Sequence, residues 1–253
     1  MLDSTNQNKG MNMNTWKNNN VLTHIKESYF LEDIDRGEVS ESLSDVKPVG
    51  GTIFYIDSDA DGTYEFFDAD GNLMENVQVG DRPHTYRVVE KGSKDKYYVY
   101  HDNVYRGLWT YYEKGSYAYD LLDTSEDIGS GKTNTEKAMA KDNGAYVAAD
   151  SDGYPTIWYQ LQQVRGAEAG GCDDWFVPSV DEFEELRKAV ESGSVRGGII
   201  AGSSYNTSVF KNKHLWSSSE TSLLSAYAWD REDQYWDGIG KYGLFSVLFT
   251  RAF

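Results

Sequence analysis

Short apolar runs bounded by turn residues dominate the chain from about residue 50 to residue 112. The run Thr52–Ile56 follows the segment Lys-Pro-Val-Gly-Gly, which is typical of a turn leading into a buried strand. The same criterion, with Asp-Gly, Lys-Gly and Arg-Gly as boundaries, predicts further strands at residues 63–68, 85–91, 96–101 and 108–112. This part of the chain therefore reads as antiparallel sheet.

Helical spacing follows in the second half of the chain. Ser179 and Glu182 have the spacing of a capping box, and apolar residues at helical intervals continue until Gly193, which predicts a helix over residues 180–192. Sheet and helix segments together indicate a mixed α+β domain.

Two more helices are predicted on weaker signals. Thr133 and Glu136 form a second possible capping box, which places a helix start near Asn134. Pro155 is acceptable in a first helical turn and opens a third helical segment, residues 155–165.

The last segment of the chain combines strands with a polar and aromatic interior. Strands are predicted near residues 214–218, 226–230 and 245–251. Residues 230–242 mix Trp, Tyr, Asp, Glu, Gln, Lys and Gly with no period of 2 or 3.6, which favours a loop presented by the flanking strands.

Composition divides the chain in two. Residues 1–49 contain an Asn- and Lys-rich lead with little to bury and a connector of scattered apolar residues among acids. Residues 50–253 carry the strand and helix signals and form the expected folded domain. The whole chain has 253 residues, of which 39% are apolar and 14% aromatic, so it can bury a sizeable core.

Charge and cysteine content exclude several classes of function. The formal charge of −17 disfavours nucleic acid and anionic membranes as partners. Cys172 is the single cysteine, so no intramolecular disulfide can form, and a buried apolar position is the favoured reading. No stretch is apolar enough for membrane insertion, and no secretory signal is visible, so a cytoplasmic location stays open.

One acidic segment has the spacing of a calcium loop. Asp57, Asp59 and Asp61 alternate before a glycine, and Glu65 and Asp68 occupy the ninth and twelfth positions. Calcium is therefore a possible ligand, although no cofactor is required. The alternative is an acidic hairpin turn, because a strand rather than a helix precedes these residues.

No pattern indicates catalysis. Gly129 to Thr133 is similar to the end of a phosphate loop, but Glu126 stands where its first glycine belongs. The four histidines are spread along the chain without metal-like spacing, and no criterion selects a catalytic carboxylate pair. We therefore expect a protein that is not an enzyme.

Five sequence blocks in a fixed order bring a resemblance to a known family. They are GGTIFYID at 50–57, IGSGKTNT at 128–135, DWFVPS and its following helix at 174–186, LWSSSE at 215–220 and FTRAF at 249–253. This order resembles the bacterial and phage branch of C-type lectin-like domains, related to formylglycine-generating enzymes. The branch includes C-terminal domains of collagen-like adhesins and the variable proteins of diversity-generating retroelements.

The resemblance implies a C-type lectin-like fold with short twisted antiparallel sheets, two main helices, and paired N- and C-terminal strands. It also implies a ligand surface just before the C-terminus, a protein or glycan receptor on a cell surface, and a location on a cell surface or virion. The chain departs from the family in residues 86–119, which have no counterpart, and in the closing block, which lacks a proline. The catalytic cysteines of the related enzymes and the sugar motifs of calcium-dependent lectins are missing, so neither activity carries over.

Within the last segment, family scaffold positions can be separated from candidate contacts. Trp216, residues 217–219, Trp229 and Arg251 match scaffold blocks, and Arg251 is expected to pair with a buried carboxylate. The candidate ligand-binding residues are Asp230, Glu232, Gln234, Tyr235, Trp236, Asp237, Ile239, Lys241, Tyr242, Leu244 and Phe245.

Three alternatives to a ligand-binding surface remain open at this point. The aromatic segment can be a solvated loop packed on its own domain. The chain can be a structural or adhesive module of a surface or phage tail assembly, with residues 1–49 as attachment segment. It can also be a divergent enzyme of the formylglycine-generating type, which a cleft with strongly shifted pKa values would favour.

Overall fold

The computed structural model describes residues 46–110, 121–141, 154–167, 171–195 and 214–253. The chain divides into two compact units, Met1–Ser44 and Asp45–Phe253, and every described residue belongs to the second. That unit includes three residues before Gly50 that take part in the fold: Lys47 and Pro48 pair with β5, and Val49 is fully buried.

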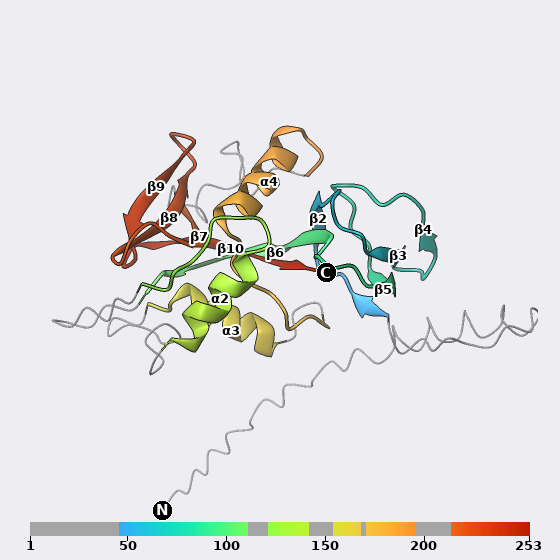
Figure 1. Cartoon of the computed structure of the whole chain (residues 1–253), viewed down its shortest axis with the longest axis horizontal. Helices are drawn as coiled ribbons and strands as arrows, with labels where there is room; N and C mark the ends of the chain where they lie inside the picture. The colour runs from blue at the N-terminus through green and yellow to red at the C-terminus, as the bar shows by residue number, and fades with distance from the viewer. Residues whose placement is uncertain (1–45, 111–120, 142–153, 168–170, 196–213) are drawn as a thin grey trace, which may run out of the picture. The chain divides into compact units, whose positions relative to one another are not determined.

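A six-stranded sheet forms the centre of the second unit (Figure 1). Its strand order is β2 (Thr52–Ile56), β6 (Tyr97–Leu108), β10 (Leu244–Ala252), β7 (His214–Glu220), β8 (Ser225–Asp230) and β9 (Tyr235–Gly240). Neighbouring strands are antiparallel, except that β10 and β7 run parallel.

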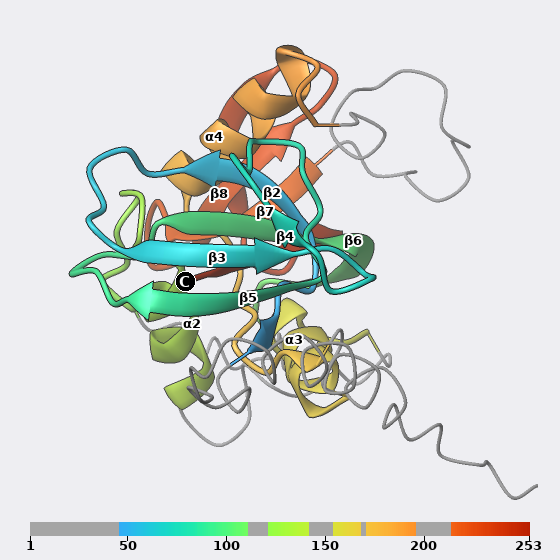
Figure 2. The same ribbon diagram turned by 90° about the vertical axis from the view of Figure 1, so that its right-hand side faces the viewer.

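A smaller four-stranded sheet lies beside it, with β3 between β5 and β4 (Figure 2). Its order is β1 (Lys47–Pro48), β5 (Thr85–Glu90), β3 (Thr63–Phe67) and β4 (Leu73–Met74). The predictions of strands at 52–56, 63–68 and 85–91 are confirmed to within a residue.

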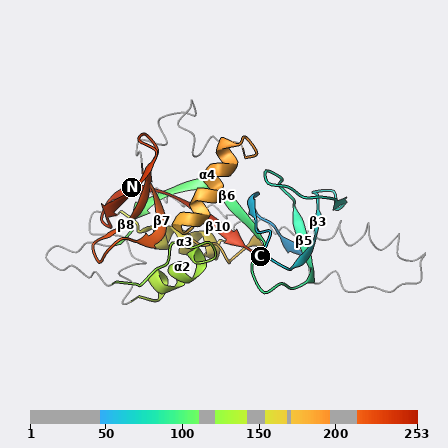
Figure 3. The same ribbon diagram turned by 45° about the horizontal axis from the view of Figure 1, so that its top comes forward.

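The helices cover both faces of the six-stranded sheet. They are α2 (Gly131–Ala140), α3 (Ile157–Gly166) and α4 (Val180–Glu191). Helices α2 and α3 lie on one side of the sheet and α4 on the other, as Figures 1 and 3 show. The α+β class is therefore confirmed.

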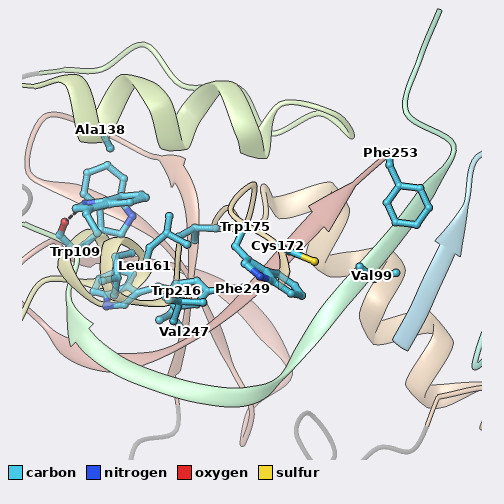
Figure 4. Packing of buried hydrophobic residues seen from close by; sticks show 14 of the residues in the cluster. Val99, Trp109, Ala138, Leu161, Cys172, Trp175, Trp216, Val247, Phe249 and Phe253 are labelled. Atoms are coloured by element: carbon cyan, nitrogen blue, oxygen red, sulfur yellow. Dashed lines mark hydrogen bonds between the residues drawn. The ribbon is translucent and has the colours of Figure 1, made fainter. Parts of the chain in front are cut away.

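Each helix layer has its own apolar core. On the α2–α3 side, Trp109, Leu161, Trp216 and Phe249 belong to one buried cluster (Figure 4). The indole N–H of Trp109 donates to the carbonyl of Ser217 at 2.8 Å, which satisfies a polar group that burial would otherwise penalise. On the α4 side, a second cluster is built from one face of α4 and the opposite side of the sheet.

The prediction of separate strands at 96–101 and 108–112 is wrong where the structure describes these ranges, because β6 is one continuous strand of 12 residues that ends at Leu108; residues 111 and 112 lie outside the described residues. The polar, Gly-containing stretch between those ranges suggested a turn. Pairing with β10 from Leu108 to Tyr98 supplies the backbone hydrogen bonds and overrides that local signal. Gly107 is there for another reason: a Cβ on it would lie 2.7 Å from the backbone nitrogen of Ile157.

The expected pairing of the first and last strands is also wrong. Strand β6 lies between β2 and β10, so a strand from the segment without a family counterpart separates them. The two ends are joined through a side chain instead: Arg251 of β10 donates to the carbonyls of Pro48 and Val49, just before β2.

The helix starts test the capping predictions. Ser179 and Glu182 form the predicted capping box of α4, with both reciprocal hydrogen bonds present. The box at Thr133 and Glu136 is wrong, because α2 begins earlier, at Gly131. Helix α3 begins at Ile157, with the Thr156 hydroxyl accepting from the N–H of Tyr159.

Among the residues that the structure describes, no helix is both long enough and apolar enough to cross a membrane.

Candidate functional site

The segment predicted as a loop, residues 230–242, instead contains strand β9. It forms a hairpin with β8 through six consecutive residue pairs, from Ser225 with Gly240 to Asp230 with Tyr235. Gln234, at φ 56°, takes the left-handed conformation that closes the four-residue turn. The strand shows no period of 2 because it packs apolar side chains on both faces, Trp236 on one and Ile239 on the other.

Four of the predicted contact residues lie on one face of the sheet, three of them on β9 and one on β10, with β7 and β8 between these two strands. Tyr235, Asp237 and Ile239 alternate along β9 and therefore point to the same side. Phe245 of β10 lies on that side as well. Its ring centre is 4.7 Å from that of His214 on β7, and His214 pairs with Asp230 of β8, which in turn pairs with Tyr235. We call Tyr235, Asp237, Ile239 and Phe245 the C-terminal face.

Two residues of the C-terminal face are packed against the core, and the other two are accessible to solvent. Ile239 and Phe245 pack partly against the core on the α2–α3 side, and the Phe245 ring lies 5.0 Å from that of Trp216. Tyr235 is 46% exposed, and Asp237 is partly exposed. Rigid aromatic and apolar groups with a carboxylate among them suit contact with another molecule.

Trp236 points to the opposite face and joins β9 to α4. Its indole N–H donates to Glu184 Oε1 at 2.7 Å, and its ring meets those of Phe183 and Trp229 at 5.2 and 5.6 Å. These contacts assign Trp236 to packing within the domain rather than to the C-terminal face.

Asp230 does not fit the expected role of an exposed contact, because it is only 1% exposed. Its Oδ1 accepts hydrogen bonds from the N–H groups of Glu232 and Asp233 at 2.9 and 3.2 Å. Its Oδ2 lies 3.3 Å from His214 Nε2. A short side chain at the strand end is used to hold the turn, which sequence spacing does not reveal.

Lys241 is likewise corrected, because its side chain is fully buried. Its ammonium group forms an ion pair with Glu220, itself 2% exposed, and lies 4.6 Å from the centre of the Trp109 ring. Glu220 Oε2 also accepts a hydrogen bond from the N–H of Leu122 at 2.8 Å. This lysine therefore anchors the β9–β10 turn from inside.

The remaining candidates lie at the two ends of the hairpin. Glu232 and Gln234 are exposed in the β8–β9 turn. Tyr242, at the other end, is 61% exposed, and Leu244 beside it is partly exposed.

Sequence reasoning missed two exposed apolar residues near Tyr242. Leu223 and Leu224 form the β7–β8 turn and are 46% and 50% exposed. The carbonyl of Leu224 accepts the N–H of Lys241 at 3.0 Å, so this turn lies against the β9–β10 turn. The signal was present as a Leu pair between polar residues, where a turn is normally polar.

The acidic segment of the possible calcium loop is arranged as a turn. Asp57 Oδ1 accepts the N–H of Asp59 at 2.8 Å, whereas Asp61 Oδ1 accepts the N–H of Ser93 at 2.7 Å. Within the described ranges, no three acidic, histidine or cysteine side chains are grouped as metal ligands. This arrangement fits the acidic-turn alternative, since the carboxylates of Asp57 and Asp61 accept from different backbone N–H groups and Asp59 contributes its own N–H to the turn.

Cys172 is buried as expected, and Arg251 pairs with a carboxylate as expected, although that carboxylate, Asp174, is 31% exposed rather than buried. The Arg251 guanidinium holds Asp174 with two contacts, Nε to Oδ1 at 2.8 Å and Nη2 to Oδ2 at 3.0 Å. It also donates to the carbonyls of Pro48 and Val49. Burial raises the pKa of the Cys172 thiol to about 11, so this cysteine is protonated at neutral pH.

Comparison with protein-family models and with curated proteins gives no match. The C-terminal face and the five sequence blocks are therefore the features of this chain that bear on its function.

Proposed function

We propose that this chain is a non-enzymatic ligand-binding protein with a C-type lectin-like domain, and that the C-terminal face and Tyr242 contact its ligand. The observation that carries the proposal is the C-terminal face itself. Its Tyr235, Asp237 and Ile239 present aromatic, acidic and apolar side chains on β9, whose other face is fixed to α4 through Trp236, and Phe245 lies on the same side of the sheet on β10. A rigid support of this kind lowers the entropy cost of binding.

The sequence blocks support a finer version of the proposal. The ligand is a protein or glycan receptor on a cell surface, the protein acts on a cell surface or virion, and residues 225–246 are diversified by a retroelement. An adjacent near-copy of the 3′ end of the gene, differing at adenines and beside a reverse transcriptase gene, would demonstrate diversification. Its absence would leave a fixed adhesin of the same fold.

The test begins with purified protein on a glycan array and on an array of displayed bacterial surface proteins. For each hit, Tyr235→Ala and Tyr242→Ala are expected to weaken binding by about tenfold or more, because exposed aromatic rings at a binding site are frequent hot spots. The melting temperature of both variants should stay within about 3 °C of the unmodified protein, because neither ring is buried.

Trp236→Ala is the matched control from the same strand. It removes contacts with α4 and is expected to destabilise the protein by roughly 2–4 kcal/mol. Hits that bind the tyrosine variants as tightly as the unmodified protein would contradict the proposed site. A cooperative loss of structure in the tyrosine variants would instead show that their rings belong to the core.

A further inference from the structure

Strand β9 is an edge of the six-stranded sheet, and its outer side carries no neighbouring strand in the part of the chain that the structure describes. An edge strand presents N–H and C=O groups that can pair with another chain. The opposite edge, β2, is covered: Ile53 receives a hydrogen bond from the N–H of Gly80 at 2.8 Å and donates one to the carbonyl of Asp81 at 2.9 Å.

The edges of the smaller sheet offer less. Strands β1 and β4 have two residues each, and β1 ends in Pro48, which has no N–H to donate. Among the described strands, β9 is therefore the longest uncovered edge.

The hairpin register identifies which backbone groups of β9 point outward. Lys241 donates its N–H to Leu224, which marks this as a hydrogen-bonded position of the antiparallel ladder. Such positions alternate, so residues 235, 237 and 239 bond to β8. The N–H and C=O groups of Trp236 and Gly238 consequently point away from the sheet.

Strand β9 carries one charged side chain, Asp237, but lacks the other usual devices that block an edge. Natural edge strands are guarded by lysine, proline or bulges. The sequence of β9, YWDGIG, contains neither residue, and its pairing with β8 has no register shift. Gly238 is exposed and carries no side chain that would keep another backbone at a distance.

The charge around this edge determines what kind of strand would fit. Asp237 lies on β9, and the adjoining turn carries Glu232 and Asp233, both exposed, against one partly buried cation, Arg231, so acids outnumber bases here. The nearby Lys241 is buried against Glu220 and contributes no exposed positive charge. A second copy of this chain would place the same acids opposite each other, whereas a basic segment would complement them.

We propose that β9 binds an extended, basic segment of a partner protein by β-strand addition, through the outward N–H and C=O groups of Trp236 and Gly238. The inference rests on the proposed function, since the added strand would lie beside the C-terminal face. It specifies the partner as a protein. Basic residues of the segment would neighbour Asp237, and apolar or aromatic residues would neighbour Tyr235 and Ile239.

The test measures binding of labelled peptides to the full chain by fluorescence anisotropy. The probe is an extended peptide whose residues on one face read valine, lysine, valine, with threonine at the positions between them, so that lysine lies beside Asp237 and the valines lie beside Tyr235 and Ile239. Two matched peptides carry glutamate in place of lysine, or the lysine sequence with alternate amides N-methylated. The variant Gly238→Pro removes an outward N–H group, and Gly238→Ala is its control. Both substitutions add a Cβ about 3.1 Å from Thr221 Oγ1, but only proline lacks the backbone donor.

The lysine peptide is expected to bind the unmodified protein and Gly238→Ala, and to bind Gly238→Pro at least about tenfold more weakly. The glutamate and N-methylated peptides should also be weaker by about tenfold or more. The N-methylated peptide tests the same hydrogen bonds on unmodified protein, so the result does not depend on how the proline variant folds.

No binding of the lysine peptide would overturn the inference. Equal binding of the N-methylated peptide, or of the lysine peptide to a folded Gly238→Pro protein, would also overturn it, because the outward backbone groups would then not take part. Equal binding of the glutamate peptide would overturn the basic character of the partner. Array hits that need Tyr235 and Tyr242 but bind Gly238→Pro normally would leave the proposed function standing and reject strand addition. Array hits that bind Tyr235→Ala and Tyr242→Ala as tightly as the unmodified protein, together with the expected peptide results, would reject the proposed function alone.

Discussion

Two neighbouring residues at the β9–β10 turn show how far burial can differ between adjacent positions. Lys241 is fully buried in an ion pair with Glu220, and Tyr242 is 61% exposed. Both are polar residues in a segment without a clear period, and both were predicted to contact ligand. Only the tertiary structure separates an internal anchor from a surface ring.

At this scale we predict that Lys241→Ala destabilises the protein by about 3–5 kcal/mol, because Glu220 would remain as a buried charge without its partner. Tyr242→Ala should change the free energy of unfolding by less than about 1 kcal/mol. Urea unfolding of both variants measures the difference.

A double variant provides the control. Adding Glu220→Gln to Lys241→Ala should recover part of the lost stability, since a neutral amide costs less to bury than a carboxylate. A Lys241→Ala protein as stable as the unmodified chain would show that the ion pair contributes nothing to folding.

At the scale of elements, Glu182 connects the beginnings of two helices. Its carboxylate accepts the N–H of Ser179 at the start of α4, at 2.8 Å, and the N–H of Gly129 just before α2, at 3.0 Å. Gly131 leaves room for this contact, because a Cβ there would lie 2.1 Å from Glu182 Oε2. The two sequence blocks that contain these residues therefore form one structural unit.

Burial raises the pKa of Glu182 to about 7 from an ordinary value of 4.5, against the opposing effect of its hydrogen bonds from backbone N–H groups. The folded state then binds the proton more tightly than the unfolded state. The stability due to this proton is fully present below about pH 4.5 and is lost as the pH rises through 7.

We therefore predict that Glu182→Gln, although less stable than the unmodified protein at low pH, loses less stability between pH 4.5 and 7. Across this window the unmodified protein should lose on the order of 3 kcal/mol more of its unfolding free energy than Glu182→Gln loses. Urea unfolding at several pH values measures it. Glu191→Gln, at an exposed position of the same helix, should follow the unmodified protein, and parallel curves for Glu182→Gln would contradict the assignment.

At the scale of the whole molecule, the structure shows where the folded unit begins. Lys47 and Pro48 pair with β5, Val49 is fully buried, and Arg251 donates to the carbonyls of Pro48 and Val49. Residues 47–49 therefore belong to the domain, although the Pro-Val-Gly-Gly signal suggested a start at Gly50.

A pair of truncations tests this boundary. A chain beginning at Asp45 should keep the melting temperature of the full chain to within about 3 °C, because it retains the whole second unit. A chain beginning at Gly50 should lose about 3 kcal/mol or more, from the buried valine and from the acceptors of Arg251. Equal thermal unfolding of the two truncated chains would place the boundary at Gly50.

The sequence by itself determined the elements whose signals are local. The strand at Thr52–Ile56 follows from an apolar run between turns, and the start of α4 follows from the reciprocal hydrogen bonds of Ser179 and Glu182, which need only residues three apart. The pairing of Arg251 with a carboxylate was also foreseen, since a buried guanidinium requires one.

Only the tertiary structure decided the features that depend on distant partners. Strand β6 is continuous because β10 pairs along it. The predicted loop is strand β9 because β8 pairs with its backbone and Glu184 of α4 accepts the indole N–H of Trp236. Asp230 and Lys241 are buried because their partners, His214 and Glu220, lie elsewhere in the chain. Apart from the local β8–β9 hairpin, these contacts join segments far apart in the sequence, so no local pattern could reveal them.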